Sequence, residues 1–212
     1  MTETTQTARV LDEGRTLLDA QGHPGVLRRL VGPAYRLLAE GRAPSPAEIA
    51  EAADLPLDAV ESALRDFGDV EWTADGRVEG FGLTRRETPH RVRVEDVNLH
   101  TWCAMDTLIA VALLDRRVRI ESPDGTTGAA LRIEADGHSI LAADPPTMVV
   151  SWYVDPVAEG VRAAGCQFGH FFASPDSAKA WLVKYPQGGI LSLDEALDTA
   201  RKFASEQFGA AL

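Results

Sequence analysis

Cysteine is scarce in this sequence of 212 residues, where Cys103 and Cys166 are the only two. Two cysteines cannot form the disulfide framework that stabilises many small secreted proteins, and in a reducing compartment both would be free thiols. Basic residues are also in the minority, with 21 Lys and Arg against 32 Asp and Glu and a formal net charge of −11. This charge argues against nucleic acid and anionic membranes as partners, because both attract basic surfaces.

Long hydrophobic runs are missing as well. No apolar stretch reaches the roughly 18 residues expected of a membrane span, and the first ten residues are polar rather than a basic segment leading into an apolar one. We therefore expect a soluble, cytoplasmic protein. Hydrophobic residues make up 45% of the chain, enough to bury a sizeable core in one large domain or in a core with a small appendage.

The stretch LHTWCAMDTLIAVALL, residues 99–114, is apolar nearly all round. It is long enough for about four helical turns, which predicts a buried helix. Asp96 or Asn98 is available to cap this helix. Cys103 and Asp106 interrupt the apolar surface three positions apart, and that spacing places their Cβ atoms on one helix face, roughly 5–6 Å from each other.

Asp106 is a candidate proton donor. Aspartate is among the residues least often buried, and both desolvation and a neighbouring thiolate disfavour its charged form. A buried Asp106 beside Cys103 should therefore resist ionisation and keep its proton. The alternative interpretation is structural: Cys103 fills a small space in the core, and Asp106 bonds to a neighbouring backbone group or to an arginine.

Residues 1–83 predict a helical, winged-helix-like N-terminal region. The segment Ser45-Pro46-Ala47-Glu48 combines a helix cap, a proline at the first helical position and a capping-box glutamate. Asp75-Gly76 marks the turn of a β-hairpin. The expected elements are helices at 10–20, 26–40, 45–53 and 57–67, followed by a hairpin at 70–83.

A winged helix often binds DNA, and its second helix then enters the major groove. Here that helix would be residues 57–67, which carry Asp58, Glu61 and Asp66 against Arg65 alone. An acidic helix is poorly suited to phosphate contacts. We therefore expect a structural or dimerising role for the region.

Residues 84–212 predict an α+β catalytic core with a mostly antiparallel sheet around the buried helix. Short alternating runs separated by turn signals predict the strands, and the run at 147–154 is the most apolar, so that it should be central. The expected strands are 90–95, 117–121, 129–134, 139–142 and 147–154, and residues 166–173 should form a strand or the approach to one. The expected later helices run from 174 to 185 and from 192 to 208.

Several motifs in this core occur together in one known family. The stretch Trp102-Cys103-Ala104-Met105-Asp106-Thr107-Leu108-Ile109 is followed by Val161-Arg162, by Cys166 and by His170-Phe171-Phe172-Ala173-Ser174, and it is preceded by Gly82-Leu83-Thr84-Arg85-Arg86-Glu87-Thr88. This combination resembles the organomercurial (alkylmercury) lyase family. The likeness covers most of the chain and is strongest from Phe81 to Phe172.

The resemblance implies specific roles for three residues. In the family, two cysteines hold the mercury and an aspartate assists proton delivery to carbon, so Cys103, Cys166 and Asp106 would take those roles. It also implies an organomercury substrate, no cofactor, cellular thiols as reductant and product acceptor, and mercuric reductase as the protein that receives Hg(II). The chain departs from many members at His100, where they have tyrosine, and from some at Gln167 and in the loop 121–125, where those have an extra cysteine.

Elementary chemistry agrees with these roles. Mercury is a soft metal that prefers thiolate ligands, and a carboxyl kept protonated by burial can deliver a proton to a departing carbanion. His100 and His170 are possible auxiliary proton carriers, although each fits a packed residue better. Trp102, Phe171 and Phe172 could line a pocket for the organic group or belong to the core.

Two other functions remain open from the sequence. One is a thiol-based metal or redox-sensing regulator that uses the winged-helix region, and the other is a family relative that acts on a different carbon–metal bond.

Overall fold

The computed structural model describes residues 3–210, and their fold is α+β, as predicted. The helices are α1 (Glu3–Asp19), α2 (Pro24–Leu38), α3 (Pro46–Ala53), α4 (Leu57–Asp66), α5 (Ala104–Leu114), α6 (Val161–Ala164), α7 (Lys179–Lys184) and α8 (Leu193–Phe208). The strands are β1 (Glu71–Trp72), β2 (Val78–Phe81), β3 (Leu83–Thr84), β4 (His90–Val94), β5 (Val97–Thr101), β6 (Val118–Pro123), β7 (Ala130–Ala135), β8 (Ile140–Asp144), β9 (Val149–Trp152), β10 (Phe171–Phe172) and β11 (Gly189–Ser192). None of the helices within 3–210 has both the length and the apolar character needed to cross a membrane.

Strands β1 to β8 form one antiparallel sheet in the order β1-β2-β3-β5-β4-β6-β7-β8. The pattern of β4 shows why it forms: Val92 and Val94 are buried while Arg91 and Arg93 point to solvent, the period of two that a half-buried strand requires. The sheet continues through β3, which straddles the predicted boundary between 1–83 and 84–212. That division of the chain stays a prediction.

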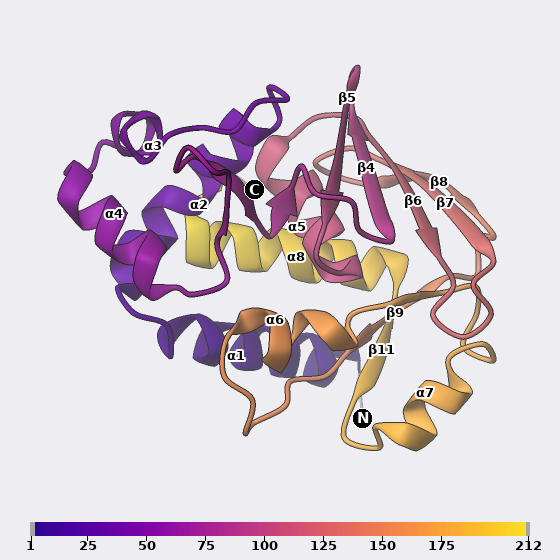
Figure 1. The fold of residues 1–212 in the computed structure, drawn as a ribbon. Coiled ribbons are helices and arrows are strands. Elements are labelled where there is room, and N and C mark those ends of the chain that lie inside the picture. The colour runs from indigo at the N-terminus through magenta and orange to yellow at the C-terminus, as the bar shows by residue number, and fades with distance from the viewer. Residues whose placement is uncertain (1–2, 211–212) are drawn as a thin grey trace.

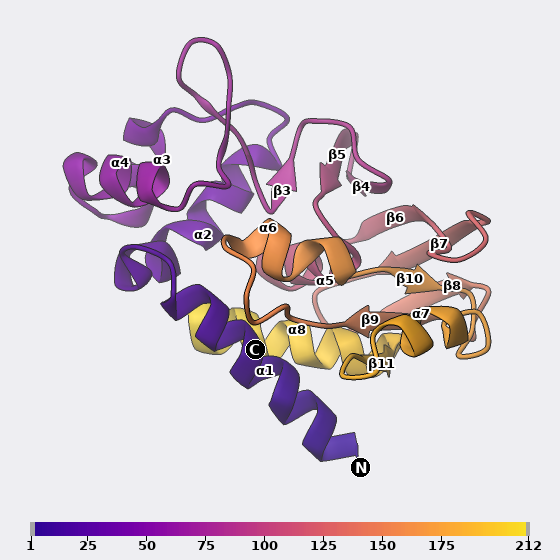
Figure 2. The ribbon, with the colours of Figure 1, turned by 60° about the horizontal axis from the view of Figure 1, so that its bottom comes forward.

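Helix α5 lies in the interior, between the large sheet and α8 (Figures 1 and 2). Leu108 and Val111 are fully buried, and each such aliphatic side chain stabilises the fold by roughly 1.5–3 kcal/mol. The helix begins at Ala104 rather than at residue 99 as predicted, because residues 97–101 form β5 and pair with both β3 and β4. The residue at the N-cap is Cys103, so the prediction of a cap at Asp96 or Asn98 was wrong.

The N-terminal region matches its sequence signals closely. Ser45 and Glu48 form the predicted capping box at the start of α3, and the hairpin of β1 and β2 turns at Asp75-Gly76. Helices α2, α3 and α4 pack against one another at one end of the molecule, while α1 lies along α8 (Figure 1). This arrangement places α2 beside α5 and α1 beside α8 rather than apart from the rest of the fold.

A smaller antiparallel sheet, in the order β10-β9-β11, completes the core. Its middle strand β9 confirms the prediction of a central strand at 147–154. The helix predicted from residue 174 begins later, at Lys179, because residues 175–178 form turns that Asp124 anchors by accepting a hydrogen bond from the Ser177 hydroxyl. Helix α8 begins as predicted, with a capping box between Ser192 and Glu195.

Candidate active site

Cys103 stands at the junction between β5 and α5. Its backbone is extended, with φ −151° and ψ 173°, and its Sγ accepts a hydrogen bond from the Asp106 backbone N–H at 3.4 Å. The Thr101 hydroxyl donates to the Cys103 carbonyl oxygen at 3.0 Å, which fixes the turn into the helix. The thiol therefore lies at a helix N-terminus, where the backbone dipoles favour negative charge.

Cys166 reaches the same place from a different part of the chain. It opens the 3-10 segment Cys166–Phe168, and the Ala104 backbone N–H donates to the Gly169 carbonyl oxygen at 3.0 Å, joining this segment to the start of α5. A Cβ at Gly169 would lie 3.1 Å from Cys103 Sγ, tighter than ordinary van der Waals contact. A glycine at this position lets the two cysteine segments approach closely.

Asp106 connects the two thiols. Its Oδ2 lies 3.2 Å from Cys103 Sγ and 3.5 Å from Cys166 Sγ, and the three potential ligand atoms all lie within 4.8 Å of one another. Both cysteines are buried and free, at 4% and 8% exposure. The two cysteines to which the family resemblance gives the mercury-holding role therefore lie side by side.

All three groups resist ionisation. Burial is the largest cause that raises the pKa of Asp106 above its usual value, whereas hydrogen bonds from both thiols lower it. As neutral S–H donors the two thiols favour the carboxylate, whereas the sequence-based expectation concerned the charge of a thiolate. Burial also raises the pKa of Cys103, although a hydrogen bond from Cys166 opposes that change.

The pKa of Cys166 is raised well above its usual value, first because Cys166 is the hydrogen-bond donor to Cys103 and second because it is buried. The two thiols are thus unequal. Cys103 donates to Asp106 but also receives hydrogen bonds that lower its pKa, whereas the hydrogen bonds of Cys166 only raise the pKa of that thiol.

The three residues line a cavity of about 110 Å³ whose other walls are almost entirely apolar. Side chains from α1, α2, α5 and α8 contribute to these walls. Apart from glycines, the other lining residues are Leu17, Leu18, Val31, Tyr35, Phe67, Phe81, Trp102, Met105, Ile109, Trp152, Val161, Phe203 and Phe208.

Trp102 is part of this wall, which fits its predicted place beside an organic group. The Arg162 guanidinium lies 4.8 Å from the centroid of the Trp102 ring and forms an ion pair at 2.8 Å with Glu71. Glu71 is only 7% exposed and also accepts a hydrogen bond from the Thr84 hydroxyl. Arg162 thereby connects the wall of the cavity to the N-terminal hairpin.

Four other residues singled out in the sequence lie away from this cavity. Phe171 and Phe172 are fully buried in the core, the second of the two placements that the sequence left open for them. The imidazole of His100 lies within hydrogen-bond distance of the Thr88 backbone, and the ring of His170 packs edge-on against Phe172. Neither histidine is among the described residues that line the cavity.

Comparison with known families agrees with this geometry. A family model described as alkylmercury lyase matches residues 83–205, and one described as the helix-turn-helix domain of alkylmercury lyase matches residues 8–82. The chain belongs to the alkylmercury lyase family. This membership supports an enzyme and not a regulator.

Relatives named alkylmercury lyase cover most of the chain. One from Bacillus cereus is 36% identical over 190 residues, which cover 88% of this chain and 87% of the relative. One from Streptomyces lividans is 38% identical over 169 residues, which cover 80% and 79% of the two chains. A crystal structure of the mercury-bound form of MerB2 matches with a TM-score of 0.72 at 23% identity, covering 94% of this chain and 98% of that one. At that identity the structural likeness shows the fold.

For this member of the alkylmercury lyase family, sequence reasoning missed one polar residue of the cavity. Tyr35 of α2 is 3% exposed and lines the cavity together with Cys103 and Asp106. Burial and the nearby Asp106, Cys166 and Cys103 raise its pKa well above the usual value, so that the phenol keeps its proton. A tyrosine on the buried face of the helix predicted at 26–40 was the available signal.

Proposed function

We propose that this chain cleaves carbon–mercury bonds by protonolysis, releasing a hydrocarbon and leaving Hg(II) on the protein. The observation that supports this most strongly is the meeting of two thiols and one carboxyl at the wall of an apolar cavity. Thiolates are the ligands that a soft metal prefers, and an apolar cavity suits the organic group that the metal carries.

The first step is the transfer of the organomercury cation from a cellular thiolate to Cys103. Cys103 is the better nucleophile of the pair, because the Asp106 backbone N–H and the Cys166 thiol both stabilise its thiolate. A sulfur–mercury bond forms to Cys103, and the cellular thiolate leaves with the electron pair of the bond that it gives up and takes the proton of the Cys103 thiol.

The second step breaks the carbon–mercury bond. As Cys166 sulfur bonds to mercury, electron density on the metal weakens its bond to carbon. Asp106 then passes its proton to that carbon, the electron pair of the carbon–mercury bond forms the new C–H bond, and the Asp106 carboxylate takes the proton of the Cys166 thiol. The net change converts the organic group and one thiol proton into a hydrocarbon, with Hg(II) bound to two sulfurs.

The 3.2 Å and 3.5 Å distances from Asp106 to the two sulfurs support this proton route. Burial raises the pKa of the Asp106 carboxyl and so favours its protonated form, which a general acid requires. We further propose that cellular thiols and mercuric reductase accept the Hg(II), in the reducing environment of the cytoplasm.

A direct test is to incubate the purified protein with methylmercury and excess thiol and to measure methane. We expect methane and Hg(II) in equal amounts over many turnovers. The matched control is the double variant Cys103→Ser, Cys166→Ser, which should give only the background rate. Absence of methane from the wild-type protein, at substrate concentrations that saturate its thiols, would contradict the proposal.

A further inference from the structure

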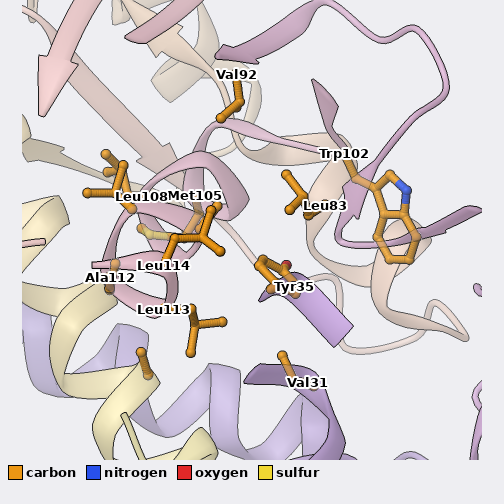
Figure 3. Close-up of a cluster of buried hydrophobic side chains, with 14 of the residues drawn as sticks. Val31, Tyr35, Leu83, Val92, Trp102, Met105, Leu108, Ala112, Leu113 and Leu114 are labelled. Atoms are coloured by element: carbon orange, nitrogen blue, oxygen red, sulfur yellow. The ribbon is translucent and has the colours of Figure 1, made fainter. Parts of the chain in front are cut away.

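Tyr35 brings a phenol from the N-terminal helical region to the cavity that the catalytic core forms. Its ring lies between Val31 and Leu83 in Figure 3, with the hydroxyl oxygen on the side of Leu83. The side chain is 3% exposed and shares the cavity wall with Cys103 and Asp106. The chain's other tyrosines, Tyr153 and Tyr185, pack in a separate hydrophobic cluster.

The turn between β2 and β3 accommodates the phenol oxygen. Gly82 has a φ of +83°, and a Cβ at this position would overlap the Tyr35 hydroxyl oxygen. The next residue, Leu83, places its backbone N–H as a hydrogen-bond donor to the phenol oxygen. Because that donor occupies a lone pair, the O–H of Tyr35 remains available to an acceptor.

The proposed reaction creates such an acceptor. When Asp106 gives its proton to carbon, a carboxylate is left in a cavity with apolar walls, where an anion without hydrogen bonds is costly. Cys166, whose Sγ lies 3.5 Å from Asp106 Oδ2, passes its proton to that carboxylate only as its sulfur bonds to mercury. A further neutral donor at the wall would stabilise the transient charge without adding charge of its own.

We propose that Tyr35 is a positioning residue that donates a hydrogen bond to the Asp106 carboxylate formed during protonolysis. The inference rests on the proposed lyase function, and it assigns to the N-terminal region a part in the chemistry. Tyr35 acts through Asp106, whereas Cys103 and Cys166 bind the mercury.

The test is the Tyr35→Phe variant, which removes one oxygen and keeps the ring. A hydrogen bond to a charged group contributes enough to change a rate by about 10- to 100-fold. We therefore expect kcat for methane release from methylmercury to fall by about 10- to 100-fold, while KM and the affinity for Hg(II) change less than about twofold. The melting temperature should stay close to that of the wild type.

The matched control is Tyr153→Phe, which removes a phenol oxygen from the separate cluster and should leave kcat unchanged. Incorporation of 3-fluorotyrosine at position 35 retains the ring and the O–H donor and should keep kcat near the wild-type value. Comparison of the Tyr35→Phe protein with the 3-fluorotyrosine protein separates the effect of losing the hydroxyl from the effect of altered packing.

A Tyr35→Phe protein with kcat within twofold of the wild type would overturn the inference while leaving the lyase function intact. A Tyr35→Phe protein that does not fold, or whose melting temperature and Hg(II) affinity fall together with kcat, shows a structural role and also overturns it. A wild-type protein that releases no methane overturns both proposals.

Discussion

Cys166 Sγ lies 3.5 Å from Asp106 Oδ2, although 60 positions separate the two residues in the sequence. The backbone hydrogen bond from Ala104 to Gly169 holds their segments together, and Gly169 lets the chain pass close to Cys103. The same carboxylate oxygen also contacts Cys103 Sγ. One acidic group thus serves both thiols, a relationship that suits an acid passing a proton between sulfur and carbon.

Replacement of either cysteine should abolish turnover. We expect Cys103→Ser and Cys166→Ser each to lower methane release to the background rate, because one thiolate binds mercury but cannot load it with enough electron density to break the bond to carbon. A serine hydroxyl is too hard a ligand and too weak an acid to substitute. Methane release and Hg(II) affinity measured on both variants check this, and a near-normal rate in Cys166→Ser would show that the second cysteine is structural.

Binding and cleavage should separate in Asp106→Asn. The variant keeps both thiols and the shape of the side chain but removes the acid, so we expect Hg(II) to bind while methane release slows by about 10²–10⁴-fold, the usual contribution of a positioned acid. The measurements are Hg(II) affinity, melting temperature and methane release on this one protein.

The structural interpretation of Asp106 predicts a different result for the same variant. Loss of a buried hydrogen-bonding partner costs roughly 1–3 kcal/mol, so stability and Hg(II) affinity would then fall together. Full-rate methane release from a stable Asp106→Asn protein would remove the aspartate from the mechanism.

Stability should depend on pH through His90. This side chain is 5% exposed, its Nδ1 lies 2.8 Å from Ser122 Oγ, and burial followed by the nearby His170 lowers its pKa to about 4. Because the pKa is about 6.5 in the unfolded chain, the unfolded state binds the proton first, and the free energy of unfolding should fall as pH drops from about 6.5 to 4. The expected loss is about 3 kcal/mol.

Denaturant unfolding at a series of pH values measures this slope. The His90→Asn variant should show a flatter dependence between pH 4 and 6.5 than the wild type, since it lacks the group that titrates. His138→Asn is the control, because His138 is exposed and its loss should leave the slope in place. Equal slopes in the wild type and in His90→Asn would contradict the assignment.

Gly82→Ala should destabilise the fold more than Gly76→Ala. Both glycines have a left-handed φ, +83° and +79°, and an alanine there costs about 1–2 kcal/mol. A Cβ at Gly82 would also overlap the Tyr35 hydroxyl, whereas nothing lies within 4 Å of a Cβ at Gly76. The difference in the free energy of unfolding between the two variants, measured by chemical denaturation, gives the cost of the overlap. Equal losses of stability would show that the phenol moves aside freely.

The sequence by itself determined the elements that depend on neighbouring residues. The capping boxes at Ser45 and Ser192 form within four residues, and both helices begin where those signals place them. The hairpin turn at Asp75-Gly76 and the alternating pattern of β4 are equally local. The closeness of Cys103 and Asp106 also followed from their spacing, although the thiol proved to be the helix cap.

Only the tertiary structure decided where α5 begins, because residues 97–101 become a strand through pairing with β3 and β4. The same holds for the active site. Cys166 reaches Asp106 through a backbone contact between distant segments, and Tyr35 reaches the cavity because α2 packs beside α5. Spacing along a chain fixes contacts within a few residues, whereas contacts between distant segments depend on how whole elements bury their apolar faces.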